Sequence, residues 1–465
     1  MKKSIKIFAA TLALITILGA VSGCGNKEAS NVEVQTVTIW TGNGHDKEFM
    51  TKKIDEWNNA EGKKLGVKIE YVVQEGGSMA EKLDLAFESG TAPDMFYGGN
   101  LKQLIAEDKI VAIDDLPGGD KLIEKYKPYL TKDVFEHEGK TYLLPIGVTT
   151  YGLIYNKDMF KAAGIVDENG EPTPPETLDE LVEYAKRLTN PEKKEYGIVF
   201  PAKFTYWYDN DITKVASASD GLPSGYNPVT GQYDLSAQAE VMKALMKIKQ
   251  DKSYLPGADG LDNDPARARF ALGGIGMKTA GSYDYGVFTE QFPAEIDWGV
   301  APFPTVSKNQ KYRQFMNATS FLKINKSAVE RVGGDKLIAI YEWFLGDEMT
   351  KAYYENGLYL PLSMDFVKGA KLPEGMENWE AFAKLTDISV TFVPGKAFDL
   401  AGQKGMDGVW LEDIWTEKIP INKIDDTVKE VENRYNEGIK KYCADHPEYN
   451  PDDYVVSDWD ARKAR

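Results

Sequence analysis

Histidine, cysteine and net positive charge are all scarce in this sequence of 465 residues. With three His and two Cys, a zinc ribbon, a disulfide framework or a histidine-rich metal site has little to build from. Lys and Arg number 55 against 72 Asp and Glu, for a net charge of −17. This excess of negative charge excludes a nucleic-acid partner that is held by the release of counterions.

The motifs of common enzyme classes are also missing. The sequence has no G-x-x-x-x-G-K-[ST] phosphate loop, no G-x-S-x-G nucleophile elbow and no H-E-x-x-H zinc motif. His45, His137 and His446 lie far apart in polar, loop-like surroundings and are predicted to be exposed. A secreted glycoside hydrolase needs two facing carboxylates. With 72 acidic residues such pairs must exist, so their presence carries no weight and this class stays an alternative only.

The longest apolar run stands at the N-terminus, where Ile7 to Val21 follows three lysines. The run is shorter than the roughly 20 residues that a membrane-spanning helix needs, so residues 1–23 are predicted to be a signal peptide. It ends in Val-Ser-Gly-Cys24, which resembles the lipobox of bacterial lipoproteins and implies acylation of Cys24. Residues 24–35 predict a flexible, lipid-anchored tether, with the protein on the extracytoplasmic face of the cell membrane. Cys443 then has no partner and is predicted to be a half-buried free thiol.

Beyond the tether, strand and helix patterns alternate. Strands are predicted over 36–40, 67–73 and 94–97, and helices over about 46–59 and from a capping box at Ser78 to Gly90. Two crossovers in so short a stretch predict a parallel, doubly wound sheet.

A second set of elements follows without a flexible linker. Helices are predicted over about 177–189, 236–252, 264–272, 326–345 and 347–355, and strands over 196–200, 274–279, 298–303 and 317–324. Chain segments that pass between two lobes without a linker favour hinged closure.

Two acidic segments raise the question of calcium. One holds Asp259, Asp262, Asn263 and Asp264, and the other spans residues 167–170. Neither has the spacing of an EF-hand loop, and Asp264 before Pro265 is simpler to interpret as a helix N-cap. No cofactor and no metal are predicted, with calcium as the alternative.

Aromatic side chains at loop positions are the positive evidence for a ligand. Trp40 and Tyr97 each end a predicted strand, Trp207 lies in a dense aromatic and acidic cluster, Tyr283 follows a strand, and Trp410 follows a glycine-rich run. A sugar offers C–H groups on its face and hydroxyls on its rim, so it suits planar rings with polar neighbours. Each ring could equally belong to the core. Trp57 and Trp343 lie on helical stripes, which predicts core positions for both.

Several segments resemble family 1 extracellular solute-binding proteins, the sugar-capturing components of ABC importers, a family that includes maltose-binding protein. They are YLLP at 142–145, GLIYNKDMF at 152–160, AGI at 163–165, PPETLDEL at 174–181, SGTAPDMF at 89–96 and WGVAPFP at 298–304. The resemblance implies a non-enzymatic protein with two doubly wound α/β lobes, joined by crossover hinge segments near 147–152, near 318–322 and after about 362. Lobe one would comprise 36–147 with 322–364, and lobe two 150–318 with 365–465.

The resemblance also implies the site, between the lobes, and the partners. The predicted ligand contacts are Trp40, Asn43, Asp46, Tyr97, Asn100, Thr149, Tyr151, Trp207, Tyr208, Tyr283 and Trp410. The expected partners are an oligosaccharide and the transmembrane subunits of an ABC permease, with the protein itself a monomer. Maltose-binding protein has a carboxylate where this chain has Thr149-Thr150, which puts maltodextrin itself in doubt. Alternatives within the fold are a peptide, a phosphorylated polyol or an acidic sugar, although the proposed loops hold almost no Arg or Lys.

Overall fold

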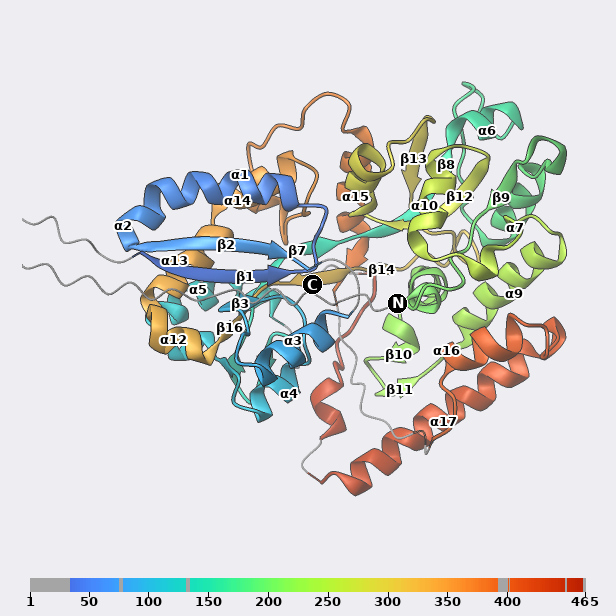
Figure 1. The fold of residues 1–465 in the computed structure, drawn as a ribbon. Coiled ribbons are helices and arrows are strands. Elements are labelled where there is room, and N and C mark those ends of the chain that lie inside the picture. Colours follow the sequence, from blue (N-terminus) through green and yellow to red (C-terminus); the bar gives the residue numbers. More distant parts are fainter. Residues whose placement is uncertain are drawn as a thin grey trace, which may run out of the picture.

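The computed structural model describes residues 34–74, 78–130, 134–391, 400, 402–447 and 450–462. The predicted signal peptide, Cys24 and nearly all of the tether lie outside these residues. Two β-sheets with helices packed on them stand on the two sides of the molecule (Figure 1). Within the described part of the chain, every helix is too short or too polar to span a bilayer.

The first sheet has five strands. In spatial order they are β2 (Val67–Val73), β1 (Gln35–Thr41), β3 (Met95–Phe96), β16 (Lys323–Asn325) and β4 (Ile110–Val111). Because β2 and β3 pair in parallel with β1 on its two sides, the first two crossovers run in opposite directions. The predicted doubly wound arrangement is confirmed here. Strand β16 returns from far along the chain and runs antiparallel to β3 and β4.

Helices cover both faces of this sheet. Helix α1 (Lys47–Trp57) lies on one face, and α3 (Met79–Glu88) and α4 (Leu101–Ala106) lie on the other (Figure 1). The remaining helices of this part are α2 (Lys63–Leu65), α5 (Gly119–Tyr126), α12 (Lys326–Val332), α13 (Gly334–Phe344) and α14 (Asp347–Glu355). Trp57 is buried and its ring contacts Trp343 at 5.6 Å between centroids. The predicted core position of Trp57 is confirmed, whereas Trp343 is half-buried at the edge of the same core. We call the sheet and these helices the first lobe.

The second sheet has four strands and its own core. In spatial order they are β13 (Trp298–Ala301), β8 (Tyr151–Asn156), β12 (Ile275–Gly281) and β9 (Tyr196–Ile198). All residues of β12 are buried, which shows that both faces of the sheet are covered. The helices around it are α6 (Lys157–Ala162), α7 (Leu178–Arg187), α8 (Lys214–Asp220), α9 (Ser236–Gln250), α10 (Asn263–Ala271), α11 (Asp284–Gly286), α15 (Glu377–Lys384), α16 (Met406–Val409) and α17 (Ile424–Asp445). We call this part the second lobe.

Between the two sheets, strand β7 (Pro145–Thr149) pairs antiparallel with β15 (Asn317–Ser320). Strand β7 leads into β8 of the second sheet, and β15 leads into β16 of the first. A third segment joins them, because the Val148 amide donates to the Leu360 carbonyl at 2.9 Å. Gly147 is needed here, since a Cβ at that position would lie 2.3 Å from the Leu360 oxygen. Three stretches far apart in sequence therefore lie side by side where the chain crosses between the lobes.

Three two-stranded pairings complete the sheet structure of the residues described. They are β5 (Glu136–His137) with β6 (Lys140–Thr141), β10 (Tyr226–Asn227) with β11 (Gln232–Tyr233), and β14 (Gln314–Phe315) with β17 (Ser389–Val390). Cys443 on α17 is half-buried and free, as predicted.

The predicted helix over 326–345 is wrong in one respect. It is two helices, α12 and α13, that meet at Gly333 with φ of 100°, a conformation that glycine adopts readily.

Candidate ligand-binding site

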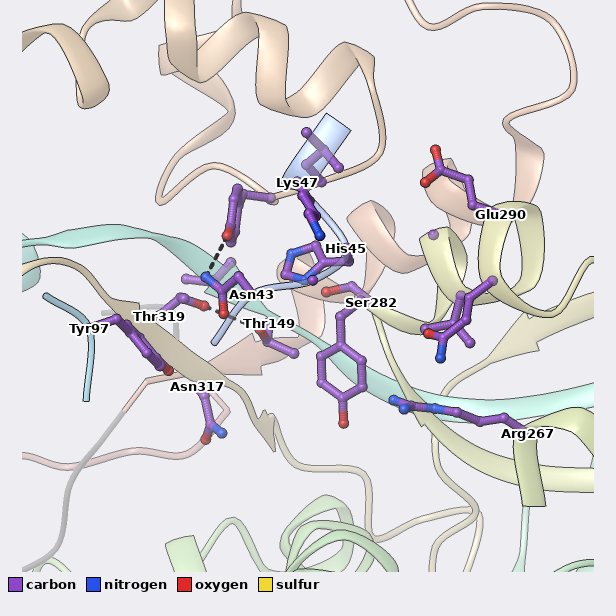
Figure 2. Close-up of a pocket in the computed structure, with 18 of the residues that line it drawn as sticks. Asn43, His45, Lys47, Tyr97, Thr149, Arg267, Ser282, Glu290, Asn317 and Thr319 are labelled. Atoms are coloured by element: carbon purple, nitrogen blue, oxygen red, sulfur yellow. Dashed lines mark hydrogen bonds between the residues drawn. The ribbon is translucent and has the colours of Figure 1, made fainter. Parts of the chain in front are cut away.

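A cavity of about 810 Å³ lies between the two lobes, beside the crossing strands. Side chains from both lobes and from β7 and β15 line it (Figure 2). This volume falls in the range of small-molecule sites, which are roughly 300–1,000 Å³.

The first lobe contributes the loop between β1 and α1. Asn43 and His45 line the cavity from this loop, Lys47 lines it from the first residue of α1, and Tyr97 lines it from the end of β3. The Asn43 backbone amide donates to the Thr41 Oγ1 at 3.0 Å and its side-chain Nδ2 donates to the Tyr359 hydroxyl at 2.8 Å. Both contacts fix the position of Asn43 before any ligand binds.

The crossing strands contribute hydroxyl and amide groups. The Thr149 and Thr319 hydroxyls lie 3.2 Å apart across β7 and β15, and the Asn317 Nδ2 donates to the Tyr151 hydroxyl at 2.9 Å. Behind the Tyr151 ring, the ammonium of buried Lys214 lies 4.5 Å from the ring centroid. A cation at this distance holds an aromatic ring by cation–π attraction.

The second lobe contributes Tyr283, which an ion pair supports. Arg267 lies with its guanidinium carbon 5.4 Å from the Tyr283 ring centroid, and its Nε donates to the Asp284 Oδ1 at 2.6 Å. The other Asp284 oxygen accepts from the Gly281 amide at 2.9 Å. A Cβ on Gly281 would lie 2.6 Å from the Tyr283 ring, so the turn after β12 requires glycine for this ring to sit at the cavity.

Two further buried titratable side chains, Asp211 and Lys278, lie next to this turn. Asp211 is 3% exposed and its Oδ1 has no hydrogen-bond partner among the described residues. Burial raises the pKa of Asp211 to about 6, opposed by the positive charge of Lys278. Burial likewise lowers the pKa of Lys278. The second lobe therefore keeps titratable groups in its interior just behind the cavity wall.

Five of the predicted contacts line the cavity: Asn43, Tyr97, Thr149, Tyr151 and Tyr283. They come from four chain regions that the fold brings together. Their role as ligand contacts stays a prediction.

Trp207 and Trp410 do not line it. Both are 0% exposed and pack with Trp415 in one aromatic cluster of the second lobe, with ring centroids 4.9 to 5.5 Å apart. The prediction that they stack on the ligand is wrong for this structure, because both rings belong to the buried core of the second lobe, together with residues of α9 and α17.

The other four predicted contacts also lie outside the cavity lining. Trp40 packs against the small cluster around Phe96. Asn100 caps α4 by accepting from the Gln103 amide at 3.1 Å. Tyr208 donates its hydroxyl to Gln238 and packs on the core of the second lobe.

Asp46 is the fourth, and it is 3% exposed. Its carboxylate accepts hydrogen bonds from two tyrosines, Tyr359 and Tyr71. Burial raises the pKa of Asp46, opposed by the neighbouring His45 and by these hydrogen bonds.

Sequence reasoning missed several residues that line the cavity, among them His45, Lys47, Arg267 and Tyr359. His45 was predicted to be exposed; instead burial lowers its pKa, and its Nε2 has no partner among the described residues. Lys47 follows the predicted contact Asp46, at the start of the helix predicted over about 46–59, so adjacency was an available signal. Arg267 on α10 and Tyr359 after α14 carried none, because helical and core positions look alike in sequence.

The acidic segments do not form a metal site in the described residues, where no group of three or more His, Cys, Asp or Glu side chains is placed to hold an ion. Asp262, rather than Asp264, is the N-cap of α10, and its carboxylate accepts from the Asn263 amide at 2.8 Å. Asp167 accepts from the amides of Asn169 and Glu171. These carboxylates close local turns.

Comparison with known protein families decides the class. Residues 41–351 match the family of bacterial extracellular solute-binding proteins. The chain belongs to this family. The predicted family and the prediction that the protein is not an enzyme are confirmed, because members of the family bind solutes.

Several curated relatives of this solute-binding protein carry sugar-related names. The maltotriose-binding protein of Pyrococcus abyssi is 26% identical over 244 residues, which cover 52% of this chain and 49% of the relative. The maltooligosaccharide ABC transporter solute-binding lipoprotein of Streptococcus pneumoniae (TIGR4) is 21% identical over 87% of this chain and 93% of its own. The chain thus spans about half the length of the first relative and nearly all of the second.

Solved structures share the fold. The GacH receptor of Streptomyces glaucescens, whose structures include a complex with acarbose, has a TM-score of 0.66 and 17% identity. The match covers 88% of this chain and 99% of the receptor. The predicted two-lobed, binding-protein-like α/β fold is confirmed.

Proposed function

We propose that this solute-binding protein captures an oligosaccharide in the cavity between its lobes and delivers it to an ABC permease. The observation that carries the proposal is the composition of the cavity wall. Tyrosine rings from both lobes (Tyr97, Tyr283 and Tyr359) stand among amide and hydroxyl groups such as Asn43 and Thr149. Flat rings suit the C–H faces of sugars, and amides and hydroxyls suit their rims. The names of the relatives support the same class of ligand.

The charges of the cavity favour a neutral sugar over an anionic one. Two cations, Lys47 and Arg267, line the cavity with three carboxylates: Glu48, Asp264 and Glu290. Arg267 is already paired with Asp264 and Asp284. The sequence predicted almost no Arg or Lys in the site loops, whereas the structure places these two cations at the cavity. Because carboxylates accompany them, they do not form an anion site. We expect binding to survive high salt, because stacking and hydrogen bonds are screened little.

A thermal-shift panel followed by calorimetry tests the proposal. The panel contains maltotriose, raffinose, arabinotriose and chitotriose, with a tripeptide and a sugar phosphate as the alternative ligands. A sugar at about 100 times its Kd adds roughly 2.7 kcal/mol to the free energy of unfolding. Tyr283→Ala should weaken binding of the hit by about 1 kcal/mol or more. The matched control is Tyr206→Ala, since Tyr206 is 62% exposed and outside the cavity. Stabilisation by the tripeptide or the phosphate alone would contradict the proposal.

The lipid anchor, the monomeric state and the lobe bounds belong to the same proposal. Acylation of Cys24 would hold the protein at the outer face of the membrane next to its permease, and the name of the pneumococcal relative includes the word lipoprotein.

We propose that 36–147 with 322–364 and 150–318 with 365–465 move as rigid lobes about the crossing strands. A sugar that contacts both lobes favours the closed form. Small-angle X-ray scattering should then show a smaller radius of gyration with the panel hit, and an unchanged curve at saturation would contradict the closure.

A further inference from the structure

Asp46 lies beside the cavity without lining it. It precedes α1, is 3% exposed, and makes no side-chain capping hydrogen bond to that helix. Its carboxylate instead accepts from the Tyr359 hydroxyl at 2.6 Å and from the Tyr71 hydroxyl at 3.2 Å. A buried carboxylate that is not used as a cap and does not face the ligand space needs another explanation.

The direction of the hydrogen bonds provides one. An ionised carboxylate can only accept hydrogen bonds, so the Tyr359 hydroxyl donates its one proton to Asp46. The Tyr359 oxygen is left as an acceptor, and the Asn43 Nδ2 donates to it at 2.8 Å. This contact decides which end of the Asn43 amide is nitrogen, and hence leaves its Oδ1 as an acceptor for another partner. Figure 2 shows Asn43 at the cavity, with this hydrogen bond drawn as a dashed line.

We propose that Asp46 is a positioning residue, which acts through Tyr359 to orient the Asn43 amide for a hydroxyl of the bound sugar. We call Asp46, Tyr359 and Asn43 the Asp46 relay. The proposal rests on the proposed function, because it assigns how one cavity residue is prepared for its ligand. Tyr359 also precedes Leu360, whose carbonyl accepts from Val148 on β7. The relay therefore links the β1–α1 loop to the crossing between the lobes.

The ring of Tyr359 has its own support, which makes the hydroxyl removable. It is 7% exposed and contacts His45 and Tyr353 edge-on, at 5.4 and 5.3 Å between centroids. Tyr359→Phe keeps these contacts and deletes only the central group of the relay. Tyr71→Phe is the matched control, since it removes the other hydroxyl on Asp46, and no hydrogen bond joins Tyr71 to Asn43 in the described structure.

The first test needs no sugar. In two-dimensional NMR of the full chain, the side-chain amide signal of Asn43, identified by its loss in Asn43→Ala, should shift in Tyr359→Phe and in Asp46→Ala. It should stay in place in Tyr71→Phe. If the Asn43 signal does not shift in Tyr359→Phe, the relay is overturned, independently of which sugar the thermal-shift panel identifies.

The second test uses the panel sugar that binds wild type. Tyr359→Phe should weaken its binding about fivefold, the value of one net hydrogen bond, and Tyr71→Phe less than twofold. In the Asn43→Ala background, Tyr359→Phe should no longer weaken sugar binding, because the amide through which Tyr359 acts is already absent. If Tyr359→Phe weakens sugar binding just as much in that background, the Tyr359 hydroxyl contacts the sugar directly and the relay is overturned. If wild type binds no panel sugar, the proposed function fails and the NMR test alone decides the relay.

Discussion

Replacing Arg267 with leucine removes the cation that pairs with the buried carboxylate of Asp284. Asp284 is 1% exposed, and it would keep only the Gly281 amide as a hydrogen-bond donor among the contacts described above. The Arg267 side chain is 13% exposed, so leucine preserves part of the packing. The perturbation is therefore mainly electrostatic.

Removing one partner of a buried ion pair typically costs about 3–5 kcal/mol, because a desolvated charge is left without compensation. That is a large part of the roughly 5–15 kcal/mol by which proteins of ordinary stability are folded. An exposed pair sets the comparison. Arg187 and Glu183 lie 3.5 Å apart with side chains 40% and 62% exposed, and such pairs contribute about 0–1 kcal/mol.

Urea unfolding, followed by tryptophan fluorescence, measures both effects on the purified protein. We expect Arg267→Leu to lose about 3 kcal/mol or more, and Arg187→Leu under 1 kcal/mol. Adding Asp284→Asn to Arg267→Leu should recover most of the loss, since the amide keeps an acceptor for Gly281 and carries no charge. Equal losses in the two single variants, or no recovery in the double variant, would refute the reasoning.

Three further predictions follow from the sequence and the buried groups. Cys24→Ala should abolish incorporation of labelled fatty acid and release the protein from cells; retention with label would contradict the lipobox. Trp207→Ala should destabilise the fold by about 3–5 kcal/mol while the folded fraction binds its sugar within twofold of wild type; intact stability with lost binding would return Trp207 to the site. Because the folded pKa of Asp211 is about 6 against about 3.9 unfolded, Asp211 lowers stability as pH rises between these values. Relative to wild type, the free energy of unfolding of Asp211→Asn should therefore rise by up to about 3 kcal/mol between pH 4 and pH 7 in urea titrations. A difference that does not change with pH would contradict the raised pKa.

Local patterns in the sequence were enough to predict much of the first lobe. Strand β2 matches the prediction over 67–73, and the Glu81 amide donates to the Ser78 hydroxyl as the capping box requires. These features depend on neighbours within a few residues. The longest described helix, α17, was not predicted, because its apolar stripe is narrow and its surface is dense with charge. The break at Gly333 was missed because glycine is tolerated within helices as well as between them.

The candidate site also has features that the sequence predicted and features that it did not. The sequence by itself determined the family, the loop after the first strand that holds Asn43, the strand end at Tyr97 and the glycine-bounded turn before Tyr283. It did not determine which aromatic rings face the ligand space, because a loop tryptophan and a core tryptophan differ only in what packs on them. Trp207 and Trp410 are buried in the core of the second lobe, whereas Asn43 and Tyr359, 316 positions apart, share a hydrogen bond. Only the tertiary structure decided these contacts, since burial and long-range pairing arise from the packing of whole elements rather than from the residues beside them.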